Sequence, residues 1–161
     1  YQVALKWYRL AADQGDAEAQ FNLGLMYDLG QGVPQDDQES VMWYRLAADQ
    51  GHAEAQSKLG LMYGNGRGVI QDYQEASKWY RLAADQGHAE AQFKLGYMYL
   101  IGRGVTQDYI LAHVLLSLAA ANLTDEEYRN VATQARNILA GKMTLEQIAE
   151  AQQLAREWKP K

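Results

Sequence analysis

The chain has 161 residues, of which 48% are hydrophobic and 22% are charged, and its formal net charge is −5 at pH 7. This composition is typical of a folded domain with its own core, and the negative charge argues against nucleic acid as a partner, because nucleic-acid binders need a basic surface. The absence of cysteine excludes disulfides and thiolate chemistry, and no apolar run reaches the roughly 18 residues of a membrane span.

The chain contains an internal repeat. The segment LGLMYDLGQGV at 23–33 returns as LGLMYGNGRGV at 59–69 and as LGYMYLIGRGV at 95–105, 36 residues apart each time. The segment WYRLAADQG also occurs three times with the same spacing. Repetition at this period is typical of stacked helical units. The repeat units expected are 17–52, 53–88 and 89–124, preceded by the second half of a truncated unit at 1–16.

The expected elements are all helices, and each unit holds two of them. In the unit 53–88, Ala55, Leu59 and Met62 are spaced so that they share one stripe of a helix over 53–65. The glycines of GNGRGV supply a turn, and Asp72 can cap a second helix over 72–85. In chain order the pattern predicts helices over 2–13, 17–29, 36–49, 53–65, 72–85, 89–101 and 108–121.

The last part of the chain leaves the repeat pattern. Thr124 with Glu127, and Thr144 with Gln147, each match a capping box, which predicts two further helices over 125–139 and 145–158. An apolar stripe that includes Leu145 suggests that the final helix covers the end of the array, as a cap does in repeat proteins.

The segments LGLMY, GRGV, QDY and KWYRLAADQGHAEAQ, together with the ending MTLEQIAEAQQLAREWKP, resemble the Sel-one-like repeat family of bacterial type, a relative of the tetratricopeptide repeats. The resemblance covers nearly the whole chain and implies an all-α fold, a right-handed α-solenoid of antiparallel helical hairpins with C-terminal capping helices. We therefore expect one repeat domain over 1–161, with the capping helices in 125–161. Because no first helix precedes 2–13, we expect the parent protein to continue upstream of Tyr1.

The resemblance also implies where a partner binds. In the tetratricopeptide arrangement the first helix of each hairpin lines the concave wall. Several residues of these first helices differ between the units of this chain. The sequence leaves two interpretations of these side chains open: burial against neighbouring helices, or exposure as a surface that contacts a partner. The predicted partner-binding row is Phe21, Leu25, Leu29, Ser57, Leu61, Asn65, Phe93, Tyr97 and Ile101.

The histidines do not form a convincing metal site. His52 and His88 hold identical places one repeat apart, and neighbouring helices pack roughly 8 to 10 Å apart, whereas zinc ligands lie within about 2.1 Å of the ion. We therefore expect both to cap helices, as Asp16 can in the same place. His113 is expected to be partly buried without a catalytic role.

Other patterns also have structural explanations. The paired glycines of the loops 30–32, 66–68 and 102–104 join helix to helix instead of strand to helix, which indicates turns rather than a phosphate site. Arg67 and Arg103 in these loops are expected to be solvated, with an acidic partner as the alternative. The three tryptophans that open WYRLAADQG are expected in the core.

The predicted function is therefore a protein–protein interaction scaffold or adaptor that binds a protein or peptide on its concave face. No catalytic residue, cofactor site or metal site is predicted, so the chain is not expected to be an enzyme, to bind nucleic acid or to insert into a membrane. The alternative is a structural spacer that positions an upstream catalytic or membrane domain. The sequence leaves open the partner, the oligomeric state and the compartment, which could be bacterial cytoplasm, periplasm or the exterior.

Overall fold

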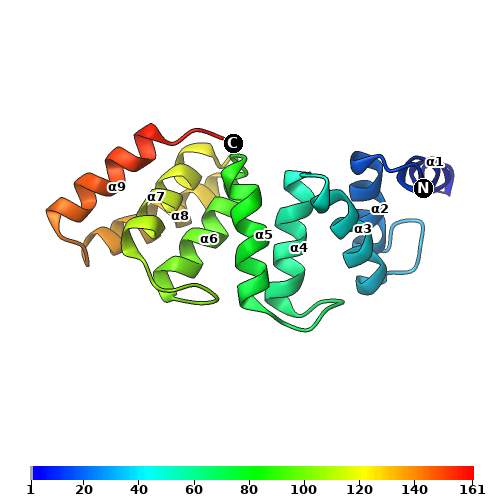
Figure 1. Ribbon diagram of the computed structural model, residues 1–161, viewed down its shortest axis with the longest axis horizontal. Coiled ribbons are helices and arrows are strands. Elements are labelled where there is room, and N and C mark those ends of the chain that lie inside the picture. The colour runs from blue at the N-terminus through cyan, green and yellow to red at the C-terminus, as the bar shows by residue number, and fades with distance from the viewer. Residues whose placement is uncertain (1) are drawn as a thin grey trace. The chain divides into compact units, whose positions relative to one another are not determined.

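The computed structural model describes residues 2–161, and every regular element within them is an α-helix (Figure 1). The helices are α1 (Gln2–Asp13), α2 (Ala17–Leu29), α3 (Asp37–Asp49), α4 (Ala53–Asn65), α5 (Tyr73–Asp85), α6 (Ala89–Ile101), α7 (Tyr109–Asn122), α8 (Glu126–Ala140) and α9 (Leu145–Glu157). The expected all-α, two-helix repeats are confirmed. We call α2, α4 and α6, the first helices of their hairpins, the A helices, and α3, α5 and α7 the B helices.

The B helices begin one residue later than expected, because an aspartate acts as the cap before each of them. Asp36 and Asp108 have extended backbones and accept bonds from free amides of α3 and α7. Asp72 does the same for α5, where the Glu75 amide donates to Asp72 Oδ1 at 3.0 Å. A capping residue lies just outside the helix that it stabilises, which explains the shift.

The glycine loops form the expected turns between A and B helices. Gly30, Gly66 and Gly102 end the A helices in the left-handed conformation, with φ of 66°, 66° and 67°. Gly68 has φ of +67°, and a Cβ placed on it would overlap the backbone of Asp37. These turns therefore depend on glycine both for backbone freedom and for close approach.

The last two helices are confirmed, but one of their predicted starts is wrong. Asp125, not Thr124, is the N-cap of α8, and its Oδ1 accepts from the Tyr128 amide at 3.1 Å. The reason is that α7 continues one residue beyond the ends of α3 and α5, to Asn122. The capping box of Thr144 and Gln147 at the start of α9 is present.

The helices group into two compact units that divide after Leu82, which we call the N-terminal and C-terminal units. In the N-terminal unit, Tyr44, Leu59 and Met62 belong to one buried cluster, to which Trp79 also belongs. A second cluster packs Trp43 against Ala12, Ala19 and Leu23. Both clusters join side chains from successive repeats, which is how a solenoid builds its core.

The prediction that all three tryptophans are buried is wrong for Trp7. Trp43 and Trp79 are 7% and 9% exposed, whereas Trp7, on α1, is 68% exposed. Trp43 is covered by Ala12 at the end of α1 and by residues of α2, which precede its own helix. No described helix precedes α1, so Trp7 lacks the equivalent cover.

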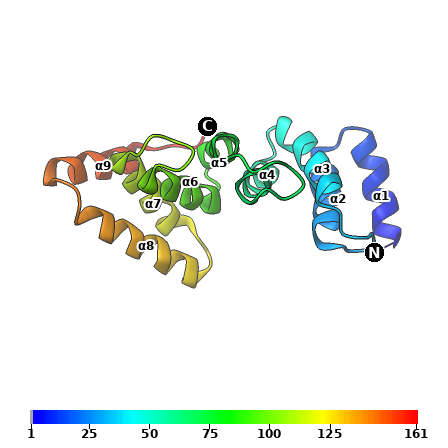
Figure 2. The same ribbon diagram turned by 90° about the horizontal axis from the view of Figure 1, so that it is seen from below.

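In the C-terminal unit, Figure 2 shows α7 between α8 and α9. Val114 and Leu118 of α7 form a buried cluster with Ala151 of α9, and Trp158 packs against it. Leu145, expected in this stripe, is 87% exposed because it is the first residue of α9. The chain then returns to the end of α5, where the Lys161 amide donates to the Asp85 carbonyl at 2.8 Å (Figure 1).

Candidate partner-binding surface

In the N-terminal unit, much of the predicted row is packed against the core. Phe21 is half-buried, and its ring stacks on the rings of Tyr44 and His52 with centroids 5.8 and 4.7 Å apart. Leu25 packs against the same cluster, Leu61 is half-buried and Ser57 is buried. The members of the row that remain exposed in this unit are Leu29 and Asn65, at the ends of α2 and α4.

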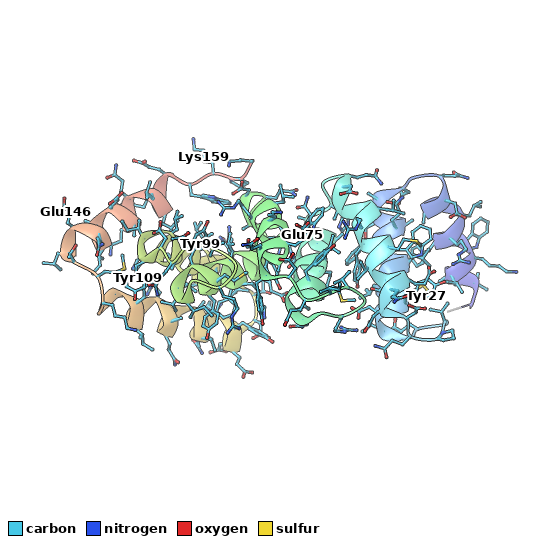
Figure 3. The ribbon with its side chains drawn as sticks, turned by 60° about the horizontal axis from the view of Figure 1, so that its bottom comes forward. Tyr27, Glu75, Tyr99, Tyr109, Glu146 and Lys159 are labelled. Carbon is cyan, nitrogen blue, oxygen red and sulfur yellow. The ribbon has the colours of Figure 1, made fainter. Side chains whose placement is uncertain are left out.

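In the C-terminal unit, the row is more exposed. Phe93 is half-buried, but Tyr97 and Ile101 are 48% and 39% exposed. The three lie four residues apart on α6 and therefore share one side of that helix. Tyr99, labelled in Figure 3, lies two residues from Tyr97 on the helix and so projects from a different side. It is buried together with Met98. Helix α6 thus has one face in the core and an aromatic and an aliphatic side chain on its accessible face.

A pocket of about 370 Å³ lies at the N-terminal end of α6, and sequence reasoning did not find it. It is formed by the start of α6, the connection between α7 and α8, and the first turn of α8. The signal for it in the sequence is a replacement, since Asn122, Leu123 and Thr124 stand where the units 17–52 and 53–88 carry Gln-Gly-His. The lining residues are His88, Ala89, Glu90, Asn122, Leu123, Thr124, Asp125 and Tyr128.

The capping role predicted for the histidines is confirmed. The Nδ1 atoms of His52 and His88 accept the amides of Ala55 and Ala91, both at 3.2 Å. The second ring nitrogen of His52 lies 3.0 Å from Glu18 Oε2, on the preceding A helix. A cap histidine can therefore stabilise its own helix and also contact a carboxylate of the neighbouring repeat.

The expectation that Arg67 is solvated is wrong. Its guanidinium pairs with Asp28, at 2.8 Å, and with Asp37. The hydrogen bond to Asp37 is the main reason why the pKa of Arg67 is raised. The Tyr44 hydroxyl donates to Asp28 at 3.2 Å, and burial raises the pKa of that hydroxyl. Arg67 thus joins its loop to the preceding hairpin and has a structural task.

His113 is buried on α7, where the sequence predicted partial burial. Its Nδ1 lies 3.4 Å from Ser117 Oγ, and the imidazole is only 4% exposed, so a substrate in solution cannot reach it. Burial, and secondarily the charge of Arg136, lower the pKa of His113 below its ordinary value of 6.5. The folded protein therefore favours the neutral form of this histidine.

Acid should destabilise the fold partly through His113. Because the pKa is lower in the folded than in the unfolded chain, its contribution to stability is complete above pH 6.5 and is lost as the pH falls from there toward the folded value. We expect the free energy of unfolding of the wild type to fall more between about pH 7.5 and about pH 5.5 than that of His113→Gln. Urea titrations at both pH values test this, and equal losses would contradict it.

Comparison with solved structures places the fold among bacterial repeat proteins. A Sel1 repeat protein from Oxalobacter formigenes is similar with a TM-score of 0.74 and 33% identity, over 96% of this chain and 69% of that one. The structure of c5321, a protective antigen of uropathogenic Escherichia coli strains with an SLR fold, is similar with a TM-score of 0.70 and 30% identity. The match covers 96% of this chain and 40% of c5321. Cysteine-rich protein B from Helicobacter pylori shares the fold, with a TM-score of 0.61 and 20% identity over 80% of this chain and 91% of that one.

The family comparison agrees with the solved structures. No curated protein matches the chain. Among the described residues, none of the helices combines the length and the apolar character needed to cross a membrane. The model of the Sel1 repeat matches residues 1–16, 17–52, 53–88 and 89–122. These matches cover most of the sequence, and the helical-repeat solenoid of the structure is that of the similar proteins, so the chain belongs to the Sel1 repeat family.

Proposed function

We propose that this chain binds a protein or peptide partner along the accessible face of α6, the A helix of its C-terminal unit. Sel1 repeat proteins generally mediate protein–protein interactions, and their scaffold is generally non-catalytic. The observation that carries the proposal is the exposure of Tyr97 and Ile101, four residues apart on a helix whose opposite face is buried. Exposed aromatic and aliphatic side chains of this kind are common anchors in interfaces.

The position of the pocket supports the proposal that the partner binds along α6. Ala89 lines the pocket and lies four residues before Phe93, so that Ala89, Phe93, Tyr97 and Ile101 form a row along α6 that turns gradually around the helix. A partner segment lying along α6 would therefore meet the pocket at the start of the helix and the exposed pair farther along. We propose that the two form one continuous binding site.

The test is affinity capture with a double variant, Tyr97→Ala with Ile101→Ala. Partners captured by the wild type from a lysate of the source organism are identified, and the affinity for the purified partner is then measured. Truncating two interface anchors should weaken binding by more than about tenfold, since each such anchor contributes at least about 1 kcal/mol. The circular dichroism spectrum should stay helical, because both side chains lie at the surface.

The matched control is Ile138→Ala. Ile138 is 67% exposed on α8 of the same unit, so its truncation removes a similar apolar side chain from a different helix. The control should bind the partner as the wild type does. Unchanged affinity of the double variant would refute the proposed face on α6.

A further inference from the structure

We infer that the pocket at the start of α6 binds the guanidinium group of an arginine side chain on the partner protein. This inference rests on the proposed function and names the chemistry at one end of the same surface. It follows from comparing the last repeat with the first, because equivalent residues in the two repeats show which interactions the pocket lacks.

The first comparison shows a carboxylate without its usual partner. Glu18, in the first turn of α2, lies 3.0 Å from the imidazole of His52. Glu90 holds the same place in α6, but Thr124 stands at the place of His52, and Asp125 follows it. Glu90, Thr124 and Asp125 all line the pocket. Glu90 thus lacks the imidazole partner that Glu18 has, and it lines the pocket together with a second carboxylate, that of Asp125. A carboxylate without this partner favours a cation from outside.

The second comparison shows a buried acceptor without a donor. In the first repeat, Gln20 Oε1 accepts from Gln50 Nε2 at 2.7 Å. Gln92, the equivalent of Gln20, is fully buried; its Nε2 donates to the Ala84 carbonyl, but its Oε1 has no hydrogen-bond partner. At the place of Gln50 stands Asn122, which is one methylene shorter and lines the pocket.

This orphaned oxygen indicates what the pocket accepts. Gln20 Oε1 accepts from Gln50, and Asn122 holds the place of Gln50, so we expect Gln92 Oε1 to lie behind the Asn122 wall of the pocket rather than on its surface. A buried acceptor without a partner costs free energy, so a ligand that brings a hydrogen-bond donor to this wall gains more than one that brings an acceptor. The pocket thus favours both positive charge and several N–H groups.

The walls of the pocket distinguish arginine from lysine. Tyr128 is 55% exposed and lies opposite the start of α6, and Leu123 adds an apolar surface. A guanidinium is planar, stacks on aromatic rings and carries five donors in fixed directions, whereas an ammonium is compact and strongly hydrated. Carboxylates of Glu90 and Asp125 beside an aromatic ring therefore suit arginine better.

The test uses the whole chain and two small probes of nearly the same shape, one charged and one neutral. N-acetylarginine N-methylamide is titrated against the isotope-labelled protein and followed by nuclear magnetic resonance. The citrulline compound is titrated in parallel; its neutral urea group has nearly the same shape but carries a carbonyl acceptor in place of two N–H donors. Saturable shifts at Glu90, Asn122 and Tyr128, and at the side-chain amide of Gln92, are expected for arginine only. Equal shifts with citrulline, or no saturable shift with either probe, would overturn the inference.

Two variants make the assignment specific. Glu90→Gln should weaken binding of the arginine probe about threefold, the effect of losing one partly exposed charge pair. Glu18→Gln removes the same charge from the equivalent place in α2, where His52 and Ala53 stand at the places of Thr124 and Asp125. This variant should leave the affinity for the arginine probe unchanged. Equal effects of the two variants would show that only net charge matters and would contradict the pocket.

The pocket and the proposed function can fail separately. If the Tyr97 and Ile101 double variant loses the partner while the arginine probe does not bind, the interaction surface stands and the pocket is refuted. If the probe binds as expected but the double variant keeps its partner, the arginine site is supported and the wider face on α6 is refuted.

Discussion

Leu59→Ala should lower the free energy of unfolding by about 2 to 5 kcal/mol. Leu59 is fully buried on α4, in the cluster that contains Tyr44 and Met62, so its truncation removes apolar contacts and leaves a cavity in a closely packed interior. In a repeat protein each unit is supported mainly by its neighbours, so the loss should affect the adjoining hairpins as well. Urea denaturation followed by circular dichroism measures the change.

Leu29→Ala is the matched control. Leu29 is 55% exposed at the end of α2, so the same truncation should change the free energy of unfolding by no more than about 0.5 kcal/mol. A loss as large as that of Leu59→Ala would mean that Leu29 is covered in solution. In that case it could not belong to an accessible binding face.

The repeated hairpins could be predicted from the sequence because their causes are local. The glycines at the ends of the A helices adopt positive φ in every unit, and Asp16, His52 and His88 supply side-chain acceptors to the first free amides of their helices. Such signals involve residues a few positions apart, so the local sequence alone determines where each helix begins and ends. The helix boundaries followed to within one residue.

Burial was harder to predict because it depends on neighbours. Trp7 and Trp43 lie in identical WYRLAADQG segments, yet one is 68% and the other 7% exposed, since only Trp43 is covered by the helices before it, α1 and α2. Phe21 and Ser57 hold equivalent places in two A helices. The larger Phe21 ring stacks on His52 and stays half-buried, whereas the small Ser57 side chain is buried. The period therefore identifies positions and leaves accessibility undetermined.

The pocket was missed for a related reason. The change from Gln-Gly-His to Asn122-Leu123-Thr124 was visible as the decay of a repeat, but its effect depends on which neighbours lose a partner. The orphaned Gln92 oxygen becomes visible only when its hydrogen bonds are compared with those of Gln20. A departure from a repeat pattern is thus informative about function when the partners of the lost residues are known.

Gly24→Ala should destabilise the protein by about 1 to 3 kcal/mol, although alanine is the better helix former. A Cβ on Gly24 would lie 2.7 Å from Cδ1 of Tyr44, which is too close for two carbons. Tyr44 cannot move away easily, because its ring is fully buried and its hydroxyl donates to Asp28. The glycine of the LGLMY segment is therefore needed for the close approach of α2 and α3. Thermal and urea denaturation measure the loss.

Gly64→Ala separates this packing effect from helix propensity. Gly64 also lies in an A helix, near the end of α4, but a Cβ there would meet only the Cβ of Ala76 at an ordinary 3.9 Å. With no clash to offset it, the gain in helix propensity should stabilise the protein by about 0.5 to 1 kcal/mol. The two substitutions are chemically identical and should have opposite signs. If both stabilised the protein, the contact between Gly24 and Tyr44 would not hold the hairpin together.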